Sequence, residues 1–190
     1  MTIQVLVKLA AIDPWSFTVL DTLKRKFGCD EVTHVERVKC WELKFRAEAA
    51  ERSVEITEGL LRDTVLLANP NRDRWVMRIF PGEGVPAGFW ERPEDAADAY
   101  IVKVTDKEDI AGQSLSRILA SRLVISDVES VSLSTIWVIE MKGRGPRSRD
   151  LAEEIAVARA WRQGLLANPH CQDAEVYPAE EYFAAEVKRA

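Results

Sequence analysis

The chain has 190 residues, of which 47% are hydrophobic, and its formal net charge is −5. This length allows one large domain or two small ones, and the apolar fraction is ordinary for a protein with a buried core. The acidic balance argues against nucleic acids and anionic membrane surfaces as partners, and no apolar run approaches a membrane span. The N-terminus lacks the features of a signal peptide and the three cysteines form no close pair, so we expect a soluble, cytoplasmic protein.

The first 80 residues alternate between strand and helix patterns. Ile3, Val5 and Val7 alternate as in a half-buried strand. Asp13 and Pro14 are typical of a helix start, and Gly28 of a helix end. The segment 30–46 changes its apolar spacing near its middle, which predicts two strands joined by a short turn. The expected order is therefore strand 2–9, a helix from 14, a strand pair within 30–46, a helix over 47–68 and a strand over 74–80.

The second half repeats this pattern. When Asp13 is aligned with Asp109, Val19 falls on Leu115, Leu23 on Leu119 and Trp41 on Trp137, so the same faces are apolar. A second long helix is expected over 150–167. We therefore expect an internal duplication, with two β-α-β-β-α-β units of the α+β class whose antiparallel sheets are covered by helices.

The five letters LLANP occur at 66–70 and again at 165–169. We interpret the leucines as the last apolar turn of a helix. The proline pushes the preceding asparagine out of the helical region, and the side chains of Asn69 and Asn168 are expected to cap free backbone groups there. The repeated LLANP segment is thus predicted to end a helix in each half. The alternative is that the two asparagines contact a partner.

The duplication divides the chain into four parts. These are a first repeat at 1–79, a Pro- and Gly-rich linker at 80–99, a second repeat at 100–177 and an amphipathic C-terminal helix at 178–190. Phe89 and Trp90 indicate that part of the linker packs, and Tyr182, Phe183 and Val187 are the residues that the last helix would bury.

Motifs for chemistry are scarce. Cys29, His34 and Cys40 are spaced too loosely for a zinc site, so no metal is expected, and a Cys–His nucleophile pair has no supporting motif. The segment KGRGPRSRD at 142–150 offers either an anion site or a turn before a helix capped by Ser148 or Asp150. It lacks the P-loop pattern. No catalytic residue is predicted.

The order of these motifs resembles the PurS family, the small subunit of phosphoribosylformylglycinamidine synthase. Family members have about the length of one repeat. The matching positions in this chain are Asp13-Pro14, Glu31-Val32, Lys39, Glu42-Leu43 and Leu66 to Asn69. Val38 replaces a family glycine. The second copy is more divergent and has Ile110, Thr135 and Val138 at the places of Pro14, Lys39 and Glu42.

The resemblance implies two ferredoxin-like, PurS-like units that form a covalent pseudo-dimer. It also implies a non-catalytic scaffold in purine biosynthesis, which bridges an ATP-dependent synthetase and a glutaminase subunit. ATP, Mg and glutamine would be used by those partners, with no cofactor bound by this chain. The chain would be a monomeric pseudo-dimer or a homodimer. The candidate interface residues are Asp13, Lys39, Glu42, Asn69, Asn168, Arg144 and Arg147.

Two other functions are compatible with the sequence. A tandem ferredoxin-like regulatory module would bind a small molecule, such as an amino acid, at the interface between the repeats. An independent enzyme has only weak candidate residues in this sequence.

Overall fold

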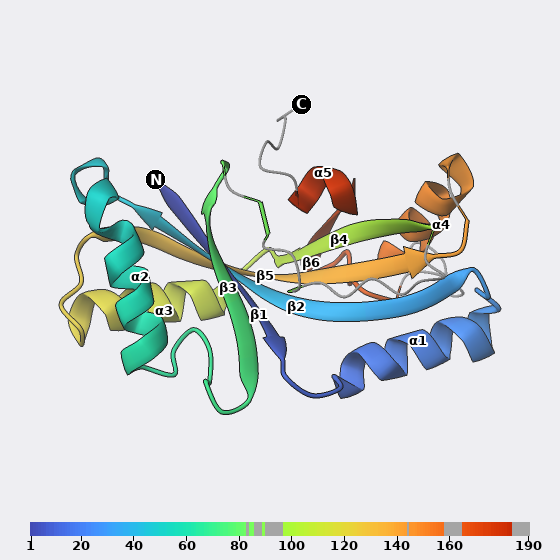
Figure 1. Ribbon diagram of the computed structural model, residues 1–190, viewed down its shortest axis with the longest axis horizontal. Helices are drawn as coiled ribbons and strands as arrows, with labels where there is room; N and C mark the ends of the chain where they lie inside the picture. The colour runs from blue at the N-terminus through green and yellow to red at the C-terminus, as the bar shows by residue number, and fades with distance from the viewer. Residues whose placement is uncertain (83, 86–88, 90–96, 144, 158–164, 184–190) are drawn as a thin grey trace.

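The computed structural model describes residues 1–82, 84–85, 89, 97–143, 145–157 and 165–183. Over these residues the chain is an α+β protein with one six-stranded antiparallel sheet and five α-helices (Figure 1). The elements are β1 (Thr2–Leu9), α1 (Pro14–Phe27), β2 (Val32–Phe45), a short 3-10 helix η1 (Ala47–Arg52), α2 (Ser53–Asp63), β3 (Asp73–Phe80), β4 (Asp98–Asp106), α3 (Ile110–Ser121), β5 (Val128–Met141), α4 (Pro146–Ala156), β6 (Gln172–Pro178) and α5 (Ala179–Phe183).

The strand order is β3-β1-β2-β5-β4-β6, so the two halves of the chain meet at the central β2–β5 pair. In the register of this pair Lys39 lies opposite Thr135, and Trp41 lies opposite Leu133. Lys39 and Thr135 are equivalent under the 96-residue offset that aligns Asp13 with Asp109. The order of strands and the register of the central pair are therefore symmetric about this point.

The strand pair predicted within 30–46 is wrong, because β2 is one strand of 14 residues. The corresponding β5 also has 14 residues, so each half has the order β-α-β-α-β. The change of apolar spacing has two causes. A register irregularity between Val32 and His34 shifts the alternation, and Arg37 and Lys39 occupy positions on the face that is otherwise apolar.

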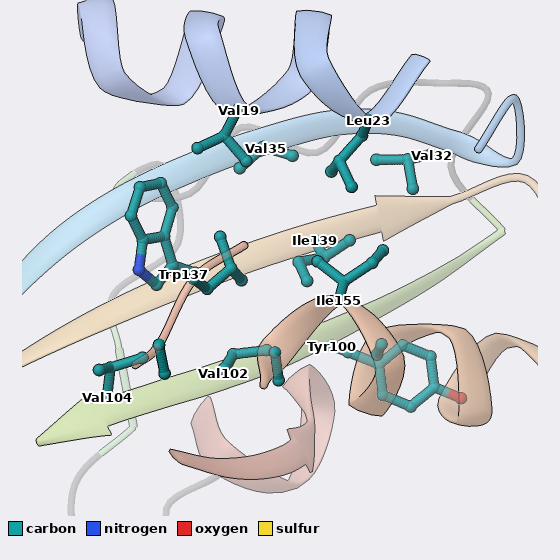
Figure 2. Packing of buried hydrophobic residues seen from close by; sticks show 14 of the residues in the cluster. Val19, Leu23, Val32, Val35, Tyr100, Val102, Val104, Trp137, Ile139 and Ile155 are labelled. Atoms are coloured by element: carbon teal, nitrogen blue, oxygen red, sulfur yellow. The ribbon is translucent and has the colours of Figure 1, made fainter. Parts of the chain in front are cut away.

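Helices α1 to α4 cover one face of the sheet through two hydrophobic clusters. In the first cluster Val19 and Leu23 of α1 pack with Ile155 of α4 and with Trp137 and Ile139 of β5 (Figure 2). In the second cluster, residues of α3 pack with α2, β1 and β2; its members include Leu115, Leu119, Leu60, Val5 and Leu43. The first helix of each half thus packs into the core of the other half, so burial couples the two halves.

The opposite face has a smaller apolar cluster. Leu6, Val38 and Ile101 of the sheet pack there with Phe89 and Tyr182. Figure 1 shows α5, which carries Tyr182, on the other side of the sheet from α1 and α3. The expected packing of the linker and tail is confirmed at Phe89 and Tyr182, while Trp90 and Val187 lie outside the described residues.

The starts of the two first helices agree with the sequence pattern. The Asp13 carboxylate accepts from the backbone N–H groups of Trp15 and Ser16, and Asp109 accepts from that of Gly112. Gly28 ends α1 with a φ of 66°, a left-handed conformation in which glycine has no steric penalty.

The two second helices differ from the predictions. In the first half η1 precedes α2, and α2 ends at Asp63, so Leu66 and Leu67 follow the helix instead of forming its last turn. In the second half α4 begins at Pro146 after Gly145, so Ser148 and Asp150 lie inside the helix and are not its N-cap. The end of the helix predicted over 150–167 is wrong, because α4 ends at Ala156 and Ala167 forms a β-bridge with Val157 outside any helix. Residues 158–164 lie outside the described residues.

Candidate functional site

A concave region lies over the centre of the sheet, on the face that carries α1 to α4. Its larger part has a volume of about 500 Å³. Three of the seven interface candidates from the sequence, Asp13, Lys39 and Asn69, line it together. The remaining lining comes from β1, the start of α1, β2 and the segment after α2; it includes Val7, Trp15, Arg37, Trp41, Val65, Leu67, Arg72 and Asp73.

A second concave part of about 310 Å³ adjoins the first and is lined by residues of both halves. Trp15 and Arg37 line both parts. The second half contributes Thr135, Trp137 and Leu165, among others. We call the two parts together the central groove, since they share these two side chains and lie on both sides of the Lys39–Thr135 pair.

Arg37 is held in place by three side chains. Its Nη2 atom donates to the Asp13 carboxylate at 3.0 Å. Its guanidinium carbon lies 5.6 Å from the ring centre of Trp15 and 5.9 Å from that of Trp137. Both distances are within the range of cation–π attraction. Asp13 therefore caps α1 and orients the cation that separates the two parts of the groove.

The LLANP segments form the same turn in both halves. The Asn69 side-chain oxygen accepts from the Asn71 N–H at 3.0 Å, and that of Asn168 accepts from the His170 N–H at the same distance. The predicted capping of backbone groups by these side chains is confirmed. In the first half the Trp41 indole N–H donates to the Leu67 carbonyl at 3.0 Å, which fixes this turn against the sheet and shapes one end of the groove. Asn168 is not part of the groove lining among the described residues.

The two turns differ at one position. The Asn69 backbone N–H donates to the Asp73 carboxylate, whereas the Asn168 N–H donates to the neutral Gln172 side chain. Burial would raise the pKa of Asp73, but the hydrogen bonds from Arg72 and the Asn69 backbone, and the charges of Arg72 and Lys39, lower it below its ordinary value. At neutral pH Asp73 is therefore ionised, and its negative charge attracts the Lys39 ammonium.

Lys39 is the cation of the groove that has no ion-pair partner among the described residues. The other three basic residues of the lining are paired, Arg37 with Asp13, Arg72 with Asp73 and Lys8 with Glu36. The Lys8 ammonium lies 5.0 Å from the ring centre of Phe89, on the opposite face of the sheet. On the groove face the lining therefore has three basic and two acidic side chains, on a chain whose net charge is negative. The exposed Lys39 ammonium is the group most available to an anion.

Glu42 is on the opposite face of the sheet. Its Oε1 atom accepts from Gln4 at 2.8 Å and from Lys103 at 2.9 Å. Gln4 in turn accepts from the Arg78 Nε atom at 2.8 Å. This network joins side chains from β3, β1, β2 and β4, and it passes over β5, which lies between β2 and β4. Arg78 and Gln4 are fully buried. The structure places Glu42 in a structural network, away from Lys39.

The basic segment at 142–150 lies at the start of α4, away from the groove. Arg147 is almost fully exposed and lies 3.4 Å from the Glu31 carboxylate, and Arg149 lies 3.1 Å from Glu153. Both cations are therefore already compensated. Arg144 falls outside the described residues.

The cysteines and histidines do not converge. Cys40 and His34 are six residues apart on β2, which corresponds to about 20 Å of extended chain. Burial and the neighbouring Glu42 raise the pKa of the Cys40 thiol to about 12, so it is not a nucleophile at neutral pH. Within the described ranges, no group of three or more His, Cys, Asp or Glu side chains is arranged to hold a metal ion. No helix in that part of the chain has the length and apolarity needed to cross a membrane.

Trp15, Arg37, Arg72 and Asp73 are groove residues that the sequence did not reveal. A signal for Arg37 was present, because it stands with Lys39 at inward positions of an otherwise apolar alternation.

No family model matches this sequence. None of the curated proteins matches it either.

Proposed function

We propose that this protein is a non-catalytic scaffold subunit of phosphoribosylformylglycinamidine synthase, in which two PurS-like units are fused. The observation that carries the proposal is the central strand pair, in which the equivalent Lys39 and Thr135 lie opposite each other. Such a register is expected when two copies of one unit associate about a twofold axis. The resemblance of Asp13-Pro14, Lys39 and Leu66 to Asn69 to the PurS pattern supplies the identity of the unit.

On this proposal the units are 1–79 and 100–177, related by a pseudo-twofold axis through the β2–β5 pair. The linker at 80–99 makes their association intramolecular, with an effective concentration in the millimolar range. The two hydrophobic clusters support such an association, because α1 and α3 each pack into the core of the other half.

A scaffold acts through its surfaces. The described residues contain a groove with an unpaired lysine, apolar walls and one exposed tryptophan, Trp15, and these are features of a binding surface. ATP, magnesium and glutamine would be handled by the synthetase and glutaminase subunits. The isolated chain is expected to have no glutaminase, ATPase or amidine-forming activity.

The test mixes the chain with the synthetase and glutaminase subunits of the same cell, in the presence of glutamine and nucleotide. We expect one chain to co-elute with one subunit of each kind in size-exclusion chromatography at micromolar concentrations. Amidine formation from glutamine should depend on the chain. If no complex forms and the synthetase uses glutamine equally well without this chain, the scaffold function is wrong.

A tandem regulatory module is the second candidate, and one observation favours it. The smaller part of the groove is lined by both halves, through Trp15, Val104 and Leu165 among others, as a ligand site at a repeat interface would be. A thermal unfolding scan with the free amino acids distinguishes the two functions. An amino acid that raises the midpoint of the isolated chain in a concentration-dependent way supports the module.

A further inference from the structure

We infer that the central groove binds one acidic segment of a partner subunit, with a carboxylate side chain on Lys39, and that each chain has one such site. The inference rests on the proposed scaffold function and names the contact that the scaffold would use. Its basis is the charge of the groove, its exposed apolar rim and the loss of that charge in the equivalent region of the second half.

The charge argument concerns Lys39. Arg37 and Arg72 already bind Asp13 and Asp73 at 3.0 Å. Asp13 also accepts from the start of α1, and Asp73 from the Asn69 backbone, so neither carboxylate is available to neutralise Lys39 by direct contact. A carboxylate that enters the groove would make the ion pair that Lys39 lacks among the described residues. Apolar walls around that pair would strengthen it by excluding water.

The rim of the groove indicates a protein segment as the occupant. Trp15 is 63% exposed and Val65 is 70% exposed, and both line the larger part. Leu165 is partly exposed and lines the smaller part. Exposed tryptophan beside aliphatic groups is typical of protein interfaces, where tryptophan carries a large share of the binding energy. A partner segment that spans both parts would cover these side chains.

The equivalent region of the second half is the smaller part of the groove, because Thr135, Trp137 and Gln172 are the counterparts of Lys39, Trp41 and Asp73. It is smaller and has lost the charge of the first half. Gly112 replaces Ser16, and a Cβ atom there would lie 2.5 Å from the Val131 carbonyl oxygen, so α3 lies directly against β5. Asp109, the counterpart of Asp13, accepts from the Leu133 backbone N–H at 2.8 Å, where the first half has the Arg37 side chain. Thr135 replaces Lys39.

These differences predict one acidic segment per chain. In the first half Arg37 and Lys39 line a concave part of about 500 Å³. In the second half the concave part is smaller, at about 310 Å³, and the neutral Thr135 and the absence of a counterpart to Arg37 remove the charge that would hold a carboxylate.

The test is zero-length cross-linking of the assembled complex with a carbodiimide, which condenses a lysine amine and a contacting carboxylate into an amide. Mass spectrometry of the wild-type complex should identify a single partner Glu or Asp joined to Lys39. The Lys39→Gln variant should bind the partner about tenfold or more weakly, as expected for loss of one member of an enclosed charge pair. Lys39→Arg should still assemble and should give no cross-link at this position, because a guanidinium does not couple.

Lys44→Gln is the matched control. Lys44 is on the same strand but on the opposite face, where it pairs with Glu129, so its neutralisation should leave assembly unchanged. A wild-type complex that survives Lys39→Gln overturns the groove assignment while the scaffold function stands. Failure of the wild-type chain to assemble overturns both. A Lys39 cross-link to a second copy of this chain overturns the inference in favour of self-association.

Discussion

Lys39 and Thr135 lie opposite each other at the centre of the sheet, on β2 and β5, and they are equivalent residues of the two halves. A symmetric pair would place two lysines or two threonines at this point. Two lysines directly opposite would repel each other, since like charges in facing strand positions are destabilising. The Lys–Thr pair therefore removes a repulsion and makes the two sides of the groove chemically different.

The contact of α3 with β5 should make Gly112 intolerant of substitution. Gly112→Ser would give the second half the residue found at Ser16. Because the new Cβ would meet the Val131 carbonyl and the Ser132 Cα at 2.8 Å or less, we expect a loss of about 1–3 kcal/mol or more. Urea unfolding of the purified variant measures this change.

Gly59→Ala is the matched control within a helix. Gly59 is inside α2 and a Cβ there would meet no atom within 4 Å. Alanine loses less conformational entropy on folding than glycine, so this variant should be stabilised by about 0.5–1 kcal/mol. Equal effects at the two glycines would contradict the close approach of α3.

The sequence predicted elements where one local cause dominates. Asp13 with Pro14 marked the start of α1, Gly28 marked its end, and the 96-residue alignment placed Asp109 at the start of α3; the structure agrees at each point. Local capping interactions determine these helix ends, and a few neighbouring residues of the sequence are enough to predict them.

The rest depended on distant contacts. β2 continues through Arg37 and Lys39, because pairing with β5 supports the strand where its inward side chains are polar. α2 ends at Asp63 although the apolar pattern continues, because Leu67 and Ala68 pack into the core from the turn that follows. The apolar face of a helix also does not indicate which other element packs against it. The packing of α1 into the second half's core, and hence the groove beside it, was not predictable from periodicity.

The interlocked cores predict that the two halves unfold together. Leu23 and Leu119 are equivalent, each is 1% exposed, and each packs into the cluster of the other half. Leu119→Ala should cost about 2–5 kcal/mol and keep a single unfolding transition. Leu123→Ala, at a position that is 40% exposed, should change stability by less than about 0.5 kcal/mol. Two separate transitions in calorimetry would show that the halves are independent.

The two N-cap aspartates should differ in their effect on stability. Asp109→Ala removes the cap of α3 and leaves the Leu133 N–H without its carboxylate partner, which should cost about 2–4 kcal/mol. Asp13→Ala removes the cap of α1 and the partly exposed pair with Arg37, for which we expect about 1–2 kcal/mol. Chemical denaturation of both variants gives the comparison, and a larger loss at Asp13 would contradict the account of α3.

Asp73 should make stability depend on pH in the acid range. Its pKa is lowered in the folded state by Arg72, the Asn69 N–H and Lys39, against the effect of burial. A carboxyl with a lowered folded pKa contributes stability that is fully present above its unfolded pKa of about 3.9 and is lost as the pH falls through the folded value.

The second half already contains the neutral equivalent, since Gln172 accepts from the Asn168 N–H as Asp73 does from that of Asn69. Asp73→Gln should therefore keep the turn, lose the attraction to Arg72 and Lys39, and lower stability at pH 7. The relevant range is about pH 5 to pH 3, roughly one unit on either side of the ordinary Asp pKa. As the pH falls through this range, the variant should lose less stability than the wild type, so the two curves of stability against pH should converge. Urea titrations of the two proteins across this range measure the effect. Parallel curves would mean that the charge of Asp73 does not contribute to folding.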